Sequence, residues 1–175
     1  MLEDLLSKYN NKDKNISLSL CKEEEKQELY EIFLEIIKEG NSYPQVLPFT
    51  FEDFLNYFFS KGSRVLICKK GAKITGGFYL KPNFPGRSSH IANAGYIVKK
   101  EYRRQGIGFY LGKCSIDIGK ELGYKAMIFN LVFKENIASV KLWQKLGFKI
   151  IGEIPKAVKK DDGSFQDACI MYLTF

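Results

Sequence analysis

A short basic and glycine-rich segment, Arg-Arg-Gln-Gly-Ile-Gly at residues 103–108, constrains the fold of this chain more than any other feature. It follows an apolar run at 91–98 that is typical of a strand, and it leads into a helical pattern from about Gly106 to Leu122. A helix N-terminus presents unpaired N–H groups and the positive end of the helix dipole, and glycine lets an anion approach the backbone. The segment therefore predicts a strand–loop–helix unit that binds phosphate or pyrophosphate, with a plain helix start as the alternative interpretation.

The spacing of this segment differs from the two best-known phosphate-binding motifs. It is not GxGxxG, so a nicotinamide-binding fold is not supported, and it is not GxxxxGK[ST], so it is not the loop of an NTPase. Its two arginines, Arg103 and Arg104, would add charge-assisted hydrogen bonds to the phosphates.

Strand and helix patterns alternate along the chain, and we find no internal repeat in the sequence. Periodicity and turn residues predict strands at 16–20, 64–68, 74–80, 91–98, 125–132, 149–153 and 165–174. They predict helices at 23–39, 51–59, 106–122 and 137–146, with Thr50 and Asn136 as N-caps. Hairpins come early and strand–helix–strand units come late, which indicates one mixed α/β (α+β) domain over residues 1–175.

The net charge of the chain indicates an anionic partner but does not identify which kind. There are 27 Lys and Arg against 20 Asp and Glu in 175 residues, so the net charge is +7. Such an excess attracts anions, which include nucleic acid, an anionic membrane and a phosphorylated cofactor.

The cysteines indicate neither a metal site nor a disulfide framework. The chain has no CxxC pair and one histidine, His90, so zinc spacing is absent and we expect no metal. We expect the four cysteines to be reduced thiols of a cytoplasmic protein: Cys21, Cys68, Cys114 and Cys169. The start, Met1 to Asp4, lacks the basic end and apolar run of a signal peptide, and no apolar stretch approaches the ~20 residues of a membrane span.

A second pattern, Asn-Ile-Ala-Ser-Val-Lys-Leu-Trp-Gln-Lys-Leu-Gly-Phe at residues 136–148, connects the first to a known family. It resembles the Asn-x-x-Ser/Ala-x-x-Leu-Tyr-x-x-x-Gly-Phe helix of the GNAT superfamily of acyl-CoA N-acyltransferases. Residues 98–108 resemble the acyl-CoA pyrophosphate segment of the same family. The two motifs occur in the family's order, separated by one helix and one strand, and the resemblance covers residues 91–153.

This resemblance implies a mostly antiparallel central sheet with helices on both faces and two splayed central strands, at 91–98 and 125–132. It implies that acetyl-CoA is the cosubstrate, with its pantetheine arm between the splayed strands. An anionic cosubstrate would account for the charge of +7 without nucleic acid or a membrane. The residues that it implies for cofactor binding are Tyr96, Ile97 and Val98 through the backbone, Arg103, Arg104, Gln105, Gly106, Ile107 and Gly108 at the pyrophosphate, and Asn136, Ser139 and Trp143 in the second motif.

This sequence lacks two residues that members of the family often use in catalysis. Trp143 stands where members often have a tyrosine that protonates the leaving thiolate, and an indole N–H is a hydrogen-bond donor only. The strand at 91–98 lacks the glutamate that many members use as a base, and His90 at its edge is better interpreted as a solvated loop residue. Asn93 and Asn130 each interrupt an apolar strand. They are our candidate catalytic and substrate-binding residues, because a buried amide needs a hydrogen-bond partner, which would be the substrate or an ordered water. The alternative is a structural role, in which they bridge the gap between the two splayed strands.

The acceptor side is indicated by residues 41–45, Asn-Ser-Tyr-Pro-Gln, in which Tyr43 is the candidate substrate contact. This segment and the two asparagines also resemble, more distantly, the fungal acetyltransferases of toxic proline analogues. That resemblance implies a small amino acid with a secondary ring nitrogen. The aromatic residues between Tyr43 and Phe59 form either an acceptor wall or a helix core, and a surplus of them would suit a homodimer interface.

We therefore predict an acetyl-CoA-dependent N-acetyltransferase in which the amine of a small molecule, an amino acid or analogue, attacks the thioester directly. One alternative is an acetyltransferase of protein N-termini or lysines, which needs an open groove that the bulky 43–59 region disfavours. The other is a non-catalytic acyl-CoA-binding regulatory module, which the unmatched tyrosine and glutamate leave open. A nucleic-acid binder is disfavoured because the lysines are scattered along the chain.

Overall fold

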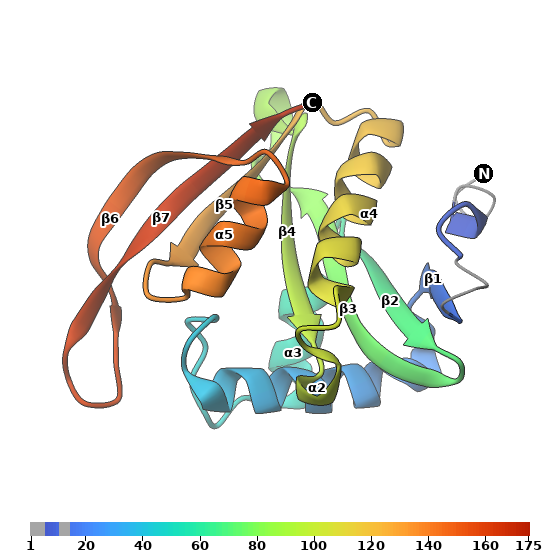
Figure 1. The fold of residues 1–175 in the computed structure, drawn as a ribbon, viewed down its shortest axis with the longest axis horizontal. Coiled ribbons are helices and arrows are strands. Elements are labelled where there is room, and N and C mark those ends of the chain that lie inside the picture. Colours follow the sequence, from blue (N-terminus) through green and yellow to red (C-terminus); the bar gives the residue numbers. More distant parts are fainter. Residues whose placement is uncertain (1–5, 11–14) are drawn as a thin grey trace.

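The computed structural model describes residues 6–10 and 15–175, so the expectation about Met1 to Asp4 lies outside the described residues. The strands of the described part form one seven-stranded sheet in the order β1-β2-β3-β4-β5-β7-β6 (Figure 1). They are β1 (Ile16–Leu20), β2 (Arg64–Lys70), β3 (Lys73–Pro82), β4 (Ile91–Val98), β5 (Ala126–Phe133), β6 (Lys149–Lys159) and β7 (Phe165–Thr174). Neighbouring strands are antiparallel except β4 and β5, which are parallel.

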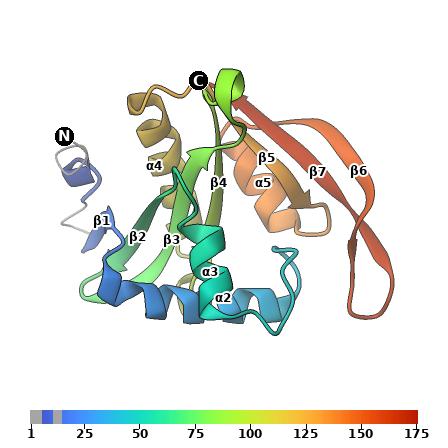
Figure 2. The ribbon, with the colours of Figure 1, turned by 180° about the vertical axis from the view of Figure 1, so that it is seen from behind.

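Helices cover both faces of this sheet. They are α2 (Lys26–Glu39), α3 (Phe51–Phe58), α4 (Ile107–Glu121) and α5 (Ile137–Lys145), with short 3-10 turns at Glu23–Glu25, Gly86–Ser88 and Lys100–Tyr102. α4 and α5 lie on the face turned to the viewer in Figure 1, and α2 and α3 are seen in front of the sheet in Figure 2. The predicted architecture, a mixed and mostly antiparallel sheet between helices, is confirmed.

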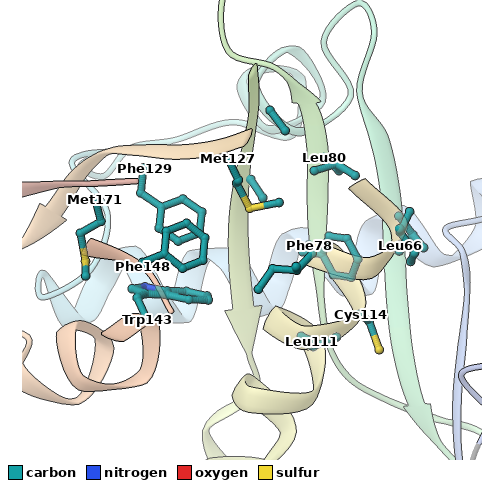
Figure 3. Packing of buried hydrophobic residues seen from close by; sticks show 14 of the residues in the cluster. Leu66, Phe78, Leu80, Leu111, Cys114, Met127, Phe129, Trp143, Phe148 and Met171 are labelled. Carbon is teal, nitrogen blue, oxygen red and sulfur yellow. The ribbon is translucent and has the colours of Figure 1, made fainter. Parts of the chain in front are cut away.

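Each face of the sheet has its own apolar core. The core under α4 and α5 gathers large side chains from strands and helices, among them Phe78, Met127, Phe129, Trp143, Phe148 and Met171 (Figure 3). The core under α2 and α3 is rich in phenylalanine and isoleucine, including Ile32, Phe33, Phe54, Phe58 and Ile97. β3 and β4 contribute to both cores because successive side chains of a strand point to opposite faces.

The helices begin where their capping residues predict. At α3, the Thr50 hydroxyl accepts a hydrogen bond from the Asp53 amide (3.1 Å), and the Asp53 carboxylate accepts one from the Thr50 amide (2.9 Å). At α5, the Asn136 side-chain oxygen accepts from the Ser139 amide at 3.1 Å. Both predicted N-caps are therefore confirmed.

The prediction for β6 was too short, because the strand runs from Lys149 to Lys159 and not to residue 153. The strand continues through Pro155, which is tolerated because β6 is an edge strand. The ladder with β7 shifts register between Ile154 and Val158, and the Lys156 amide bonds instead to the Asp167 carboxylate at 2.9 Å. A bulge thus lets the strand continue past the proline.

Among the described helices, we find none that combines the length and the apolar character needed to cross a membrane.

Candidate functional site

The central feature of the site is the separation of β4 from β5. The two strands pair only at Ile91 with Ala126 and at Ala92 with Met127, and they diverge beyond that point (Figure 1). A cleft of about 210 Å³ opens between them. Its described lining includes ten residues with polar side chains, which are Ser42, Tyr43, Tyr57, Tyr79, Asn93, Tyr96, Asn130, Asn136, Ser139 and Trp143. The predicted splay of two central strands is confirmed, and it creates a space for a ligand within the sheet.

The predicted phosphate cradle lies at the start of α4. Gly106 has a φ of +83°, and a Cβ added there would meet nothing within 4 Å. Arg104, with a φ of +60° and an exposed side chain, forms the turn with it, and α4 begins at Ile107. The first amides of α4 have no partner within the helix, so they are open to an anion above a glycine that leaves the approach clear. This arrangement fits a pyrophosphate.

The side chain of Arg103 does not extend into this cradle. Its guanidinium donates to both carboxylate oxygens of Glu39, at 3.0 and 2.7 Å, and to the Val98 carbonyl at 3.1 Å. The sequence pattern predicts that Arg103 binds the phosphates directly. The ion pair ties the loop to the C-terminal end of α2 instead, so Arg103 holds the cradle in place. The neighbouring Gln105 side chain is likewise used locally, since it donates to the Glu101 carbonyl at 2.8 Å.

The second motif borders the cleft from α5. The Asn136 amide nitrogen donates to the Asn41 carbonyl at 3.2 Å, in addition to the cap bond, so this side chain joins α5 to the loop after α2. The Trp143 indole donates to the Ser139 hydroxyl at 2.9 Å. Its ring lies 4.6 Å from the rings of both Tyr96 and Phe129 and is only 6% exposed. Trp143 is thus a core residue (Figure 3) that also lines the cleft.

Residues 94–96 of β4 line the cleft. The Tyr96 carbonyl accepts a hydrogen bond from the Tyr43 hydroxyl at 2.8 Å, so a ligand that pairs with this carbonyl must share it or displace Tyr43. The Tyr96 side chain points to the other face of the sheet, where its hydroxyl lies 2.6 Å from the Ser115 hydroxyl.

Three tyrosines, Tyr43, Tyr57 and Tyr79, form one side of the cleft, which we name the tyrosine wall. The rings of Tyr57 and Tyr79 lie 5.6 Å apart, and their hydroxyls are 3.2 Å apart. The Tyr79 hydroxyl donates to the Asn93 side-chain oxygen at 3.3 Å. Burial raises the pKa of all three hydroxyls, so at neutral pH they are hydrogen-bond donors and not bases.

Asn93 lies where the two strands part. Its amide nitrogen donates to the Ile128 carbonyl of β5 at 2.9 Å, which bridges the gap just after the last backbone pair. The tyrosine wall is thereby connected to β5 through one side chain. This bond supports the structural interpretation of Asn93, while its place in the cleft lining leaves it in reach of a substrate.

Asn130 is exposed, although its apolar neighbours suggested a buried amide. The β5–β7 ladder shifts register between Phe129 and Val132, and this irregularity turns Asn130 outward to a mutual amide pair with Asn83, at 2.6 and 3.4 Å. His90 is exposed, in agreement with its interpretation as a loop residue.

The sequence reasoning missed several residues of the site. The sequence leaves the aromatic residues between Tyr43 and Phe59 as either an acceptor wall or a helix core, and Tyr57 among them lines the cleft. Lys81, which no sequence pattern indicates, lies beside the tyrosine wall. Glu39 was missed as the partner of Arg103. A tyrosine within a phenylalanine-rich helix was the available signal for Tyr57, because a buried hydroxyl needs a partner.

The comparisons with known proteins agree with this geometry. A family model described as the acetyltransferase (GNAT) family matches residues 26–148. N-acetyltransferase aca1 of Schizosaccharomyces pombe is 41% identical over 103 residues, which cover 58% of this chain and 49% of that protein. Protein SPT10 of Saccharomyces cerevisiae is 35% identical over 82 residues, which cover 47% of this chain and 13% of that protein. The chain therefore spans about half the length of the first relative and much less of the second.

Solved structures share the fold over nearly the whole chain. A GCN5-related N-acetyltransferase from Kribbella flavida superposes with a TM-score of 0.88 at 26% identity, covering 93% of this chain and 99% of that one. A GNAT superfamily phosphinothricin acetyltransferase from Sinorhizobium meliloti, in complex with AcCoA, has a TM-score of 0.82 at 17% identity and covers 92% of this chain and 89% of that one.

Proposed function

The chain belongs to the acetyltransferase (GNAT) family, and from this we propose that it transfers acetyl from acetyl-CoA to the amine of a small molecule, an amino acid or an amino-acid analogue. The observation that carries the proposal is the open cleft between β4 and β5, which extends from the tyrosine wall to the second motif on α5. The cradle at Gly106 supplies a binding place for the phosphates of the cosubstrate.

Acetyl-CoA supplies the acetyl group as a thioester, and transfer forms a C–N bond, breaks the C–S bond and releases CoA and a proton. We assign the phosphates to the amides of residues 104–108 and the pantetheine arm to the backbone of residues 96–98 and to Asn136, Ser139 and Trp143. Arg103 holds the cradle through Glu39. These residues bind and orient the thioester. The translational and rotational entropy of acetyl-CoA is therefore lost on binding and adds nothing to the barrier of the transfer step.

The acceptor would enter from the tyrosine wall, because its hydroxyls and the two asparagines are polar groups on that side of the cleft. The amine must arrive without its extra proton, since an ammonium has no lone pair. We propose that Asn130, whose exposed amide lines the cleft, contacts the acceptor or an ordered water that accepts this proton. Asn93 orients the Tyr79 hydroxyl and bridges the strands. A cytoplasmic location remains part of the proposal, and the four free cysteines of the described residues are consistent with it.

The experiment that tests this function is mass spectrometry of an amine mixture incubated with the protein and acetyl-CoA. The mixture contains the common amino acids, cyclic imino acids, aminoglycosides, polyamines and short peptides. We expect one small amine to gain the mass of an acetyl group, and a cyclic imino acid would support the resemblance to acetyltransferases of proline analogues. Acetylation of peptides alone would contradict the proposal in favour of a protein acetyltransferase. Binding of acetyl-CoA with no acetylated product would indicate a non-catalytic module.

Asn130→Ala is expected to lower kcat/KM for the acceptor about 10-fold or more, because a hydrogen bond to a reacting group contributes roughly 1.5–3 kcal/mol. Acetyl-CoA affinity should stay near the wild-type value, since Asn130 lies away from the cradle. Steady-state kinetics and calorimetric titration measure the two quantities. The matched control is Asn83→Ala, which removes the other member of the amide pair. An equal loss of kcat/KM in both variants would show that activity depends on the Asn83–Asn130 amide pair and not on a contact between Asn130 and the acceptor. An unchanged kcat/KM in Asn130→Ala would assign this residue a structural role.

A further inference from the structure

The ammonium group of Lys81 is held against the tyrosine wall. Its Nζ atom lies 4.9 Å from the centroid of the Tyr79 ring and 5.7 Å from that of Tyr57. It donates a hydrogen bond to the Ser60 hydroxyl, just beyond α3, at 3.0 Å. Both tyrosines line the cleft, whereas Lys81 is not among its lining residues, so the lysine places a positive charge next to the tyrosine wall.

The sheet register fixes this placement. Lys81 of β3 is paired with Asn93 of β4, and paired side chains lie on the same face of the sheet. Tyr79 precedes Lys81 by two residues and therefore shares that face, which is the face covered by α2 and α3. The charge thus sits next to Asn93, where β4 and β5 part.

Lys81 differs from other lysines with a partly covered ammonium group. Lys26, Lys69 and Lys160 each form an ion pair with a glutamate. Within the part of the chain that the structure describes, no carboxylate is paired with Lys81. Burial lowers its pKa, which reflects an ammonium that has lost part of its hydration.

A partly buried ammonium group without a paired carboxylate can still bind an anion. It has three N–H donors, of which one is used by the Ser60 hydroxyl, and its attraction to the ring faces leaves the donors themselves unpaired. A carboxylate is the complementary group, because a charge-assisted hydrogen bond in a partly desolvated place is stronger than one in water. A structural role, in which Lys81 only joins β3 to the end of α3, is the interpretation to be tested against it.

We infer that Lys81 recognises a carboxylate on the acceptor, so that the preferred substrates are amines carrying an acidic group, as amino acids do. This inference rests on the proposed function and sharpens it, because Lys81 then selects amino acids over simple amines. The carboxylate would occupy the edge of the tyrosine wall beside Asn93. The amine of the same molecule would then extend into the cleft toward the splayed part of β4.

A binding experiment tests the inference independently of turnover. The probes are cyclopentanecarboxylate, which has the acid and no amine, and the uncharged cyclopentanecarboxamide, each titrated by NMR into the protein saturated with CoA. We expect the wild-type protein to bind the carboxylate more tightly than the amide. Lys81→Met should weaken carboxylate binding about 10- to 100-fold, the range of a charge-assisted hydrogen bond, and leave binding of the amide unchanged. Lys81→Arg should retain most of the preference because it keeps the charge.

Lys120→Met is the matched control, because Lys120 also lies over an aromatic ring, 5.7 Å from the centroid of Phe175, but at the far end of α4. It should leave binding of both probes unchanged. Equal binding of the two probes by the wild-type protein would overturn the inference. So would a loss of both probes in Lys81→Met together with a lower melting temperature, since that result would assign Lys81 a structural role.

Kinetics then separate this inference from the proposed function. With proline and pyrrolidine as acceptors, Lys81→Met should lower kcat/KM for proline about 10- to 100-fold and leave that for pyrrolidine unchanged. Acetylation of both amines by the wild-type protein with equal efficiency would overturn the inference and leave the acetyltransferase activity established. If no amine is acetylated but the carboxylate probe binds through Lys81, the anion site is supported and the proposed function fails.

Discussion

Replacing Gly106 by valine is expected to weaken acetyl-CoA binding more than about 100-fold, which corresponds to two or more lost charge-assisted hydrogen bonds. Gly106 has a φ of +83°, a conformation that a β-branched residue rarely adopts. A valine would therefore change the turn that presents the first amides of α4. Its side chain would also fill the space that is now open above the backbone. Calorimetric titration of acetyl-CoA into the variant measures the loss.

Gly123→Val provides a closely matched control for this prediction. Gly123 follows the other end of α4, has a φ of +87°, and likewise has nothing within 4 Å of an added Cβ. The two substitutions introduce similar backbone strain, so they should lower the melting temperature by similar amounts. Only Gly106→Val should lose acetyl-CoA binding, and Arg104→Ala added to it should weaken binding further. Equal affinities in the two valine variants would rule out the cradle as the phosphate site.

Trp143→Ala is expected to reduce the free energy of unfolding by about 3–5 kcal/mol, the range for removing a large aromatic side chain from a core. Trp143 is 6% exposed and packs against Tyr96. It also packs against Phe129 and Phe148 (Figure 3). Gly112 of α4 closes the cluster, because a Cβ there would lie 2.9 Å from the Trp143 ring. The cavity left by alanine cannot be filled by a small shift of one neighbour. Urea denaturation followed by circular dichroism measures the change.

Ile137→Ala is the control on the same helix, since Ile137 is 54% exposed and should change the free energy of unfolding by less than about 0.5 kcal/mol. A loss below about 1 kcal/mol in Trp143→Ala would contradict the assignment of this residue to the core. The prediction also bears on catalysis. A loss of this size would assign Trp143 a packing role, in keeping with an indole N–H that donates hydrogen bonds but is not an acid at neutral pH.

Much of the fold was predictable because it depends on neighbours in the sequence. The N-caps at Thr50 and Asn136 are satisfied by amides three residues away, so local sequence identifies them. The strand at 91–98 was predicted with the bounds that the structure shows. The edge strand β6 was not, since its continuation past Pro155 depends on a bulge and on the Asp167 side chain of the neighbouring strand.

The candidate site was predictable only in part. The motif at 103–108 identifies the start of α4, and the motif at 136–148 identifies α5, but neither says where each side chain goes. Arg103 illustrates this, because the local pattern directed it to a phosphate and the fold directs it to Glu39 at the end of α2. Asn130 is exposed for a similar reason, since a register shift between β5 and β7 turns it outward.

The family, the order of the elements and the glycine-rich helix start could be recognised from the sequence, because each is encoded in residues a few positions apart. Which side chains lie together on the acceptor side depends instead on the three-dimensional fold. Tyr57 comes from a helix, Lys81 from a strand and Asn93 from the next strand, and their proximity depends on the register of β3 with β4 and on the packing of α3 against the sheet. Long-range contacts of this kind are set by the fold as a whole, so the chemistry of acceptor recognition could not be read from the order of residues alone.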